Sequence, residues 1–500
     1  MLKMIFFITG FLIGFSVLAW RRIDWALMFL LAALPTYVVR FQIGPLPSTL
    51  LEGMILIAFA VWSLRHTRFG DFLRGKYGVK DFLKNSPFSK KGSKETRLKY
   101  PFGTEIVLML LVSLAAVAIA GFTSDALGIW KAYFFEPALL FILILNVFQG
   151  RKDIERIVWS LGCGALAVAS WAIIQKITGL GIDNPLWAAE ATRRSVSFFG
   201  YPNAIGLYLA PIIMLLLGAV AASHQDNHPF LSAYPGKFVK ENYNWKSSKT
   251  KAFLAFIAVL SGLAIYYAKS DGAIVALAAA LFIVGLLGNK RTRLVAVTLG
   301  VVAVLALAVI PGGYKKVEDK LALRDFSGQV RVAQWSETWK MLKDGRFITG
   351  SGLAGYQKAI EPYHIPGIFY DDGTDPEFHR HVVWNDDYKK KVWRPVEIYL
   401  YPHNIVLNFW TELGLIGLLL FAWILGKAIK LAIGNWQLAN RNKDYSAKFL
   451  SLGVLGAFIV VIVHGLVDVP YFKNDLACLF WAMLAILSLL FLRIKNPSIR

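Results

Sequence analysis

The sequence predicts an all-α, polytopic membrane protein with about 12 to 14 transmembrane helices. Apolar residues make up 56% of the 500 residues and the mean hydropathy is +0.52, both higher than in soluble globular domains. Apolar windows of about 17 to 25 residues, the length that crosses the hydrocarbon core of a bilayer, recur along the chain. One long polar segment, 312–403, interrupts them. We therefore expect residues 1–500 to form a single integral membrane domain with one large, partly helical extracytoplasmic loop.

Thirteen windows are apolar and long enough to be spans. They lie near residues 4–20, 25–41, 48–64, 104–121, 129–149, 157–177, 203–222, 252–269, 273–288, 294–311, 404–425, 449–467 and 475–493. The first window is kept as a span and not as a signal peptide. Arg21, Arg22 and Asp24 follow it without a small-residue cleavage pattern.

The distribution of basic residues predicts the orientation, because short basic loops resist translocation. Segment 65–103 is the most basic, with eleven Lys or Arg against three acids between residues 65 and 100, and is expected to be a cytoplasmic loop. Alternation then places 178–202 and 312–403 on the extracytoplasmic side. The net charge of +22 reflects this topology, so the expected partners of the basic loop are anionic membrane lipids and not nucleic acid.

The polar loop has no disulfide to brace it. The only two cysteines, Cys163 and Cys478, lie inside predicted spans. Its packing must come from its own aromatic residues. A helix over 328–343 is expected, because Val332, Trp335 and Trp339 recur at steps of three and four residues.

The first candidate site lies just before the window near 203–222. Arg193 and Arg194 precede Pro202 and Asn203, residues that favour the start of a helix. The free amides at a helix start attract anions, and an arginine beside them can grip a phosphate with its planar fork. The alternative is that both arginines are interfacial anchors for lipid headgroups.

The second and third candidates lie at the two ends of the polar loop. Arg331 and Trp335 share one helical face, and His403 with Asn404 opens the next apolar window. A neutral imidazole at the mouth of a span can accept a proton from a hydroxyl group. The plainer interpretations are a surface ion pair for Arg331 and a hydrogen-bonded interfacial residue for His403.

These motifs together resemble the O-antigen ligase and polymerase superfamily of multispanning glycosyltransferases. The resemblance covers roughly the C-terminal two thirds of the chain. It is carried by Arg194 with Phe199-Gly200-Tyr201-Pro202-Asn203, Ser270-Asp271-Gly272-Ala273, Arg331 with Trp335, Gly350-Ser351-Gly352, Pro402-His403-Asn404 with Leu407, Glu412-Leu413-Gly414 with Gly417, and His464-Gly465-Leu466-Val467-Asp468. Two positions depart from the pattern: Tyr201 stands where the family often has asparagine, and Asp271 where it often has arginine.

The resemblance implies transfer of a glycan from an undecaprenyl-pyrophosphate-type lipid to an acceptor hydroxyl, with inversion and without a metal or other cofactor. It implies an inner or plasma membrane enzyme acting on the extracytoplasmic side. Arg194 and Arg331 would stabilise the departing pyrophosphate and His403 would activate the acceptor. The remaining implied substrate contacts are Arg193, Asn203, Trp335 and Asn404. A metal site at Asp375, Glu377, His379 and His381 is weakly supported, because ligand-like spacing within a loop has little specificity.

Two questions of function stay open at the level of sequence. A ligase uses a lipid-linked core oligosaccharide as acceptor and a polymerase uses another lipid-linked repeat, and the motifs do not separate them. A transporter or flippase of lipid-linked sugars would also need many spans and arginines. Transporters often carry paired repeats with broken helices, and the sequence shows no matched halves, which favours the enzyme.

Overall fold

The computed structural model describes residues 2–43, 46–66, 101–148, 151–223 and 248–495. Within these ranges the chain is mostly helical, and its strands form only two two-stranded antiparallel sheets. Eight helical segments are long and apolar enough to cross a membrane. They are α8–η2–α9 (Ser124–Trp130, Lys131–Phe135, Glu136–Val147), α10 (Arg151–Thr178), α12 (Asn203–Ser223), α13 (Ser248–Ala268), α15 (Lys290–Val309), α21 (Ile405–Arg441), α22 (Tyr445–Gly465) and α23 (Asn474–Lys495). The predicted all-α polytopic class is confirmed.

Shorter apolar helices complete the bundle, and one of them corrects a predicted span. They are α1 (Leu2–Arg21), α2 (Ile23–Ala32), α3 (Leu50–His66), α7 (Gly103–Ile119) and α14 (Asp271–Leu287). The window 25–41 is not one helix, because α2 ends at Ala32 and a 3₁₀ turn, η1 (Leu34–Val38), follows. Pro35 lies in that turn; it has no backbone N–H to continue an α-helix. A hairpin of β1 (Arg40–Ile43) and β2 (Leu46–Thr49) then leads to α3.

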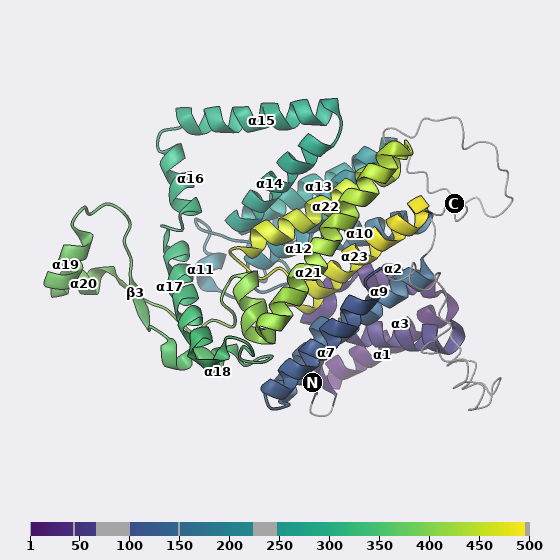
Figure 1. Cartoon of the computed structure of the whole chain (residues 1–500), viewed down its shortest axis with the longest axis horizontal. Helices are drawn as coiled ribbons and strands as arrows, with labels where there is room; N and C mark the ends of the chain where they lie inside the picture. Colours follow the sequence, from purple (N-terminus) through teal and green to yellow (C-terminus); the bar gives the residue numbers. More distant parts are fainter. Residues whose placement is uncertain (1, 44–45, 67–100, 149–150, 224–247, 496–500) are drawn as a thin grey trace.

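The centre of the bundle is built on α12 and α22. In Figure 1, α22 lies beside both α12 and α21, and α10 packs on α12 while α23 packs on α21. A methyl group on Gly218 would lie 2.8 Å from the Cα atom of Gly453, so the two helices meet backbone to backbone. Small residues permit this close approach in membrane bundles, where packing and not hydrophobicity drives association. The two helices therefore pack tightly near the C-terminal end of α12 and the N-terminal part of α22.

Segment 312–403 is partly helical, as predicted, and lies at one end of the bundle (Figure 1). The predicted helix over 328–343 is confirmed as α17, with bounds Phe326–Met341. Its other elements are α16 (Gly313–Leu321), the π-turn η4 (Leu342–Arg346), α18 (Tyr356–Ile360), η5 (Glu361–Tyr363), β3 (Gly367–Phe369), α19 (Phe378–Trp384), α20 (Asp386–Val392) and β4 (Trp393–Pro395). The loop predicted over 178–202 holds only the short helix α11 (Pro185–Ala188). Most of the predicted basic loop over 65–103, namely residues 67–100, lies outside the described ranges.

A break in α21 receives the segment that precedes α18. At Gly414 the backbone has φ of 73° and ψ of −179°, which interrupts the helix. The freed amide of Leu415 donates to the Ile348 carbonyl at 3.0 Å, and Ser351 donates to the Thr411 carbonyl. Gly350, at φ of 66°, fits against the same turn. The glycine motifs around 350 and 414 therefore form one joint that anchors the polar segment to the membrane bundle.

Gly414→Ala is expected to destabilise the protein by at least about 1–3 kcal/mol, the cost of a strained left-handed residue. Its added methyl group would also overlap the Ile348 carbonyl oxygen. Thermal unfolding in detergent measures the effect. Gly426→Ala on the same helix is the matched control, because nothing lies within 4 Å of its methyl position. A Gly414→Ala protein as stable as this control would contradict the account of the joint.

Candidate functional site

The segment before α12 is held rigidly by one buried glutamine that the sequence analysis did not single out. The Gln175 Oε1 atom accepts the amides of Val196 and Ser197 at 3.0 and 2.6 Å, and its Nε2 atom donates to the Ser197 and Gly181 carbonyls. Ser197 itself has a positive φ of 51°. The sequence signal for this role was a glutamine, Gln175, near the end of a predicted span. The side chain is fully buried in the fold, and a buried amide needs hydrogen-bond partners.

Arg194 faces the start of α12 and the turn between α13 and α14. Its Nε atom donates to the Ala268 carbonyl at 3.0 Å, and Nη2 donates to the Lys269 carbonyl at 3.2 Å and to Asn203 Oδ1 at 3.4 Å. Burial lowers the pKa of Arg194, and the nearby Asp271 carboxylate opposes that shift. Asp271 also pairs with Lys320 of α16. The Ser270-Asp271 motif thus lies beside Arg194.

Arg193 points elsewhere, to the C-terminal end of α10. Its Nη1 atom donates to the Lys176 and Ile177 carbonyls at 3.1 and 3.0 Å, and its Nε atom to the Ala188 carbonyl. Carbonyl groups at a helix end lack intrahelical partners, and arginine satisfies them here. The structure gives Arg193 this local structural contact; its predicted substrate contact stays a prediction.

Asn203 connects Arg194 to the end of α22. Its Nδ2 atom donates to Asp468 Oδ2 at 3.2 Å, while its Oδ1 atom faces Arg194. Asp468 is only 2% exposed and also accepts the amide of Val469. The C-terminal His464–Asp468 motif is therefore brought to the first candidate segment, 265 residues away in the chain.

Arg331 lies on α17 and has spare hydrogen-bonding capacity. Its Nη1 atom reaches Ser327 Oγ at 3.3 Å, whereas the buried Nε atom has no partner. Among the described residues, no Asp or Glu oxygen lies within 4.0 Å of its side-chain nitrogen atoms. The surface ion pair considered for Arg331 is thus not formed within those ranges. An unsatisfied guanidinium N–H is costly to bury, and an anionic ligand would satisfy it.

The turn that carries His403 is clamped by α17. Gln334 Nε2 donates to the Tyr401 carbonyl at 2.9 Å, and Trp335 Nε1 donates to the Pro402 carbonyl at 2.8 Å. His403 then adopts a φ of 45°, a strained conformation for a residue with a side chain. Such strain persists only where the surroundings impose it, which is frequent at functional sites.

The same glutamine selects the tautomer of His403. Because Gln334 Nε2 donates to a carbonyl, its Oε1 atom faces His403 Nδ1, at 3.2 Å. An oxygen acceptor requires a proton on Nδ1, so the neutral ring keeps its lone pair on Nε2. His403 is therefore prepared to accept a proton through Nε2. The sequence analysis missed Gln334; its position three residues after Arg331, on the same helical face, was the available signal.

Burial of His403 favours its neutral form. Burial lowers its pKa below the usual 6.5; the Asp468 carboxylate raises it and the Arg331 guanidinium lowers it. The rings of Tyr399 and Tyr401 stand 5.0 and 4.9 Å from the imidazole. Asn404 caps α21 by accepting the Val406 and Leu407 amides, and it also donates to the Leu466 carbonyl. The second, third and C-terminal motifs hence meet around His403.

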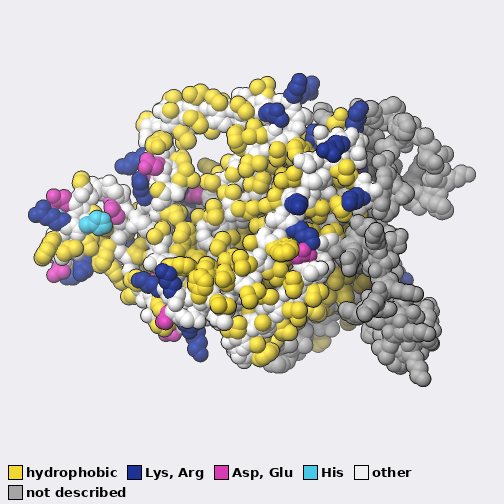
Figure 2. Space-filling view, in the orientation of Figure 1, with side chains coloured by type: hydrophobic (Ala, Val, Ile, Leu, Met, Phe, Trp, Pro, Cys, Tyr) yellow, Lys and Arg dark blue, Asp and Glu magenta, His cyan; other side chains and the backbone are white. Residues whose placement is uncertain are grey.

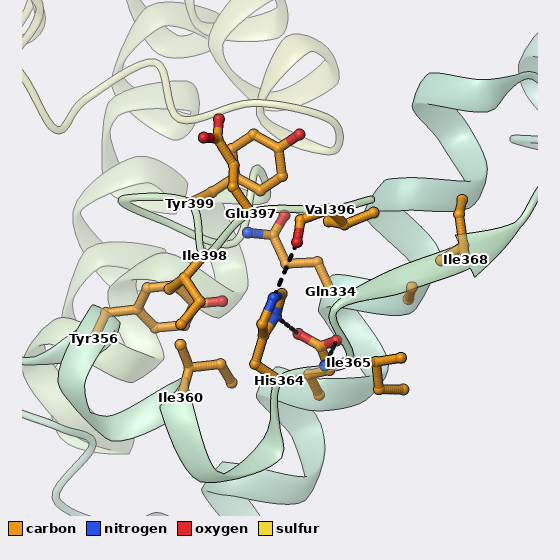
Figure 3. Close-up of a pocket in the computed structure, with 12 residues that line it drawn as sticks. Gln334, Tyr356, Ile360, His364, Ile365, Ile368, Val396, Glu397, Ile398 and Tyr399 are labelled. Carbon is orange, nitrogen blue, oxygen red and sulfur yellow. Dashed lines mark hydrogen bonds and ion pairs between the residues drawn. The ribbon is translucent and has the colours of Figure 1, made fainter. Parts of the chain in front are cut away.

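Behind the clamp, a small polar cluster supports Gln334. His364 bridges Glu337 of α17 at 3.4 Å and the Val396 carbonyl at 3.1 Å, and Figure 3 shows these contacts beside Gln334. The Ile365 amide also donates to Glu337 at 2.9 Å. These bonds hold the segment leading to Tyr399 against α17, so the His403 turn is supported from two sides.

The weak metal-site candidate lies far along the polar segment, near α19 and α20 at the edge of the view in Figure 1. There His381 contacts Asp375 at 2.7 Å and Glu377 at 3.8 Å. In the described part of the chain, no group of three or more His, Cys, Asp or Glu side chains is arranged to hold a metal ion.

Gln334→Glu is expected to move the acidic limb of the pH–rate profile upward by about one pH unit. A carboxylate beside Nδ1 would stabilise the imidazolium, so the His403 pKa would rise and the neutral base would be lost at a higher pH. Turnover measured between pH 4.5 and 8 tests this. Glu337→Gln, on the far side of the cluster, is the comparison. If the acidic limb of the pH–rate profile does not shift in Gln334→Glu, Gln334 does not position His403.

Residues 256–422 match the family model described as O-antigen ligase. The matched range begins in α13 and ends in α21, so it contains Arg331, Gln334 and His403 but neither Arg194 nor Asp468. No curated protein matches the chain.

Proposed function

We propose a specific transfer reaction for this chain. Its residues 256–422 match the O-antigen ligase model, and on that basis it belongs to the O-antigen ligase superfamily. Membership supports a membrane protein with a glycosyltransferase-type activity. Our proposal is that it moves a glycan from an undecaprenyl-pyrophosphate-type lipid to a hydroxyl of an acceptor such as a lipid A core, at the extracytoplasmic face of the inner or plasma membrane. A polymerase that extends lipid-linked repeat units is the second candidate.

One observation carries the proposal. Arg194, Arg331 and His403, though remote in sequence, are connected through Asn203, Asp468 and the charges acting on the imidazole. Two guanidinium groups and a neutral imidazole are what this reaction needs: the departing diphosphate gains negative charge, and the attacking hydroxyl must lose its proton. A transporter has no need of a base with a selected tautomer.

In the proposed step, the acceptor oxygen attacks the anomeric carbon of the donor while His403 Nε2 takes the hydroxyl proton. The bond from the anomeric carbon to the diphosphate oxygen breaks, and its electron pair leaves with the lipid diphosphate. Arg331 and Arg194 stabilise that charge. A single displacement inverts the anomeric centre and needs no metal. Asn203, Trp335 and Asn404 are proposed to line the same region, and Arg193 to lie at its edge.

The decisive test incubates the purified protein with a lipid-diphosphate glycan and, separately, a lipid-linked core and a second lipid-linked repeat. Extension of the core supports ligation, and extension of the repeat supports polymerisation. The anomeric configuration of the product tests inversion, and turnover after chelation of divalent metals tests metal independence. If neither acceptor is extended, the transferase proposal fails and transport of the donor across vesicles becomes the next assay.

Arg194→Lys is expected to reduce transfer at least tenfold, because a lysine cannot keep the three directed N–H contacts of the guanidinium while binding an anion. The steady-state rate at saturating donor and the donor KM measure the effect. Arg291→Lys is the matched control, since Arg291 is an exposed residue of α15. Full activity of Arg194→Lys would identify Arg194 as an anchor.

A further inference from the structure

A cavity of about 320 Å³ adjoins the His403 turn on the side of the N-terminal hairpin. Its wall includes Arg40 of β1, Tyr37 and Tyr133, Tyr401, and Phe472 with Lys473 just before α23. The proposed reaction assigns no role to Arg40, Tyr133 or Lys473. The cavity is therefore a feature to be explained separately.

The aromatic side chains give this cavity flat apolar walls with polar edges. Tyr37 is 3% exposed and Phe472 is 7% exposed, so packing fixes both rings. Tyr133 meets Phe472 edge to face, with centroids 6.1 Å apart. Pyranose rings present C–H groups on their faces and hydroxyl groups around their edges. Rigid aromatic walls with nearby hydrogen-bonding groups suit such a ligand better than a purely apolar one.

Two basic groups of the cavity make no direct ion pair in the described residues. No Asp or Glu oxygen within those ranges lies within 4.0 Å of the side-chain nitrogen atoms of Arg40 or Lys473, although Asp125 and Glu412 line the same cavity. The Asp475 and Asp468 carboxylates act on Lys473 from a greater distance. The buried Glu412 carboxylate accepts the Ala354 amide at 2.8 Å, and Asp125 is on the exposed first turn of α8. An anion on a bound ligand could therefore supply the direct contact that both cations lack.

Lys473 is held in place by two tyrosine side chains. Its ammonium nitrogen lies 3.7 Å from the ring centroid of Tyr201 and 3.4 Å from the hydroxyl oxygen of Tyr37. A cation over a tyrosine ring is stabilised by the ring's negative face. Tyr201 therefore positions a basic group in the cavity wall.

Tyr401 connects the cavity to the base. It lines the cavity, and its ring centroid is 4.9 Å from that of His403. A ligand in the cavity would thus reach the imidazole past Tyr401.

Resting on the proposed function, we propose that this cavity binds the acceptor saccharide, and that Arg40 and Lys473 select a sugar carrying an anionic substituent, either a carboxylate or a phosphate. Recognition would combine stacking on the tyrosine walls with charge-assisted hydrogen bonds to the substituent. The anionic preference depends on Tyr201 holding Lys473.

The test uses the full-length protein in detergent with saturating lipid-diphosphate donor and three matched acceptor oligosaccharides: neutral, carboxylated and phosphorylated. The wild-type protein should prefer one or both anionic acceptors in kcat/KM. Lys473→Gln and Arg40→Gln should each reduce that preference about tenfold, mainly through KM. Tyr201→Leu should do the same, and Tyr201→Phe should retain it. Lys390→Gln, an 80% exposed lysine of α20, is the matched control.

The outcomes separate this inference from the proposed function. Absence of transfer to every acceptor would overturn the transferase proposal; binding of the oligosaccharides without donor, measured by calorimetry, would still test the cavity. Transfer with equal kcat/KM for all three acceptors would overturn the anionic preference. A preference that survives in both Lys473→Gln and Arg40→Gln would place acceptor selection elsewhere. The two anionic acceptors distinguish a carboxylate from a phosphate.

Discussion

His403→Ala is expected to reduce glycan transfer by about 10²- to 10⁴-fold, the range that a positioned general base contributes. The imidazole is clamped by Gln334 with its Nε2 lone pair free, and no other described group is assigned to take the acceptor proton. Single-turnover rates with lipid-diphosphate donor measure the effect. The variant should still insert and bind donor, because the Gln334 and Trp335 bonds to residues 401 and 402 do not use the imidazole.

The pH dependence of the wild-type protein provides a second readout for His403. The base acts in its neutral form, and burial lowers its pKa below 6.5. The rate should therefore decline at a lower pH than an unperturbed histidine would give, as the ring becomes protonated. His379→Ala, an exposed histidine of α19 in the same polar segment, is the control. A near-normal rate in His403→Ala would exclude His403 as the base.

Arg331→Ala should lower the transfer rate by about 10²- to 10³-fold, as expected when one preorganised donor to developing charge is removed. The Arg331 Nε atom is buried and lacks a partner, so the substrate diphosphate would supply the missing acceptor. Arg331→Lys should recover only part of the rate, because an ammonium cannot form paired contacts. The measured quantities are kcat at saturating donor and the donor KM.

If Arg331 has only a structural role, Arg331→Ala should leave the pH profile unchanged. If its charge acts on His403, Arg331→Ala should shift the profile. The Arg331 guanidinium lowers the pKa of His403, so its removal should move the acidic limb to higher pH. Arg380→Ala is the matched control, because that side chain is 71% exposed and pairs with Glu377. If Arg331→Ala keeps the wild-type turnover and an unshifted acidic limb of the pH–rate profile, Arg331 is not part of the site.

Much of the architecture was accessible from composition and spacing. Long apolar windows predict spans because the bilayer leaves few alternatives for an apolar segment of that length. The window 25–41 failed because hydropathy does not report the missing N–H of Pro35. The motifs at Arg194, Arg331 and His403 were found because arginines, histidines and glycines at the borders of spans are conspicuous.

The supporting residues could not be found in the same way. Gln175 and Gln334 are ordinary polar residues in sequence, and their roles depend on which carbonyl and amide groups stand opposite them in the fold. The same holds for Lys473, whose position depends on the rings of Tyr201 and Tyr37. Contacts between segments separated by tens to hundreds of residues leave no local pattern.

Composition and spacing were enough to identify an all-α membrane protein with a long polar segment and with arginine and histidine motifs in its polar segments. Bilayer length and side-chain chemistry act locally, so they can be read one segment at a time. The folded structure was needed to show that Asn203 bonds Asp468, that Gln334 selects the His403 tautomer, and that the Arg193 side chain contacts the end of α10. Those outcomes depend on directional hydrogen bonds between distant segments, which exist only after the helices have packed.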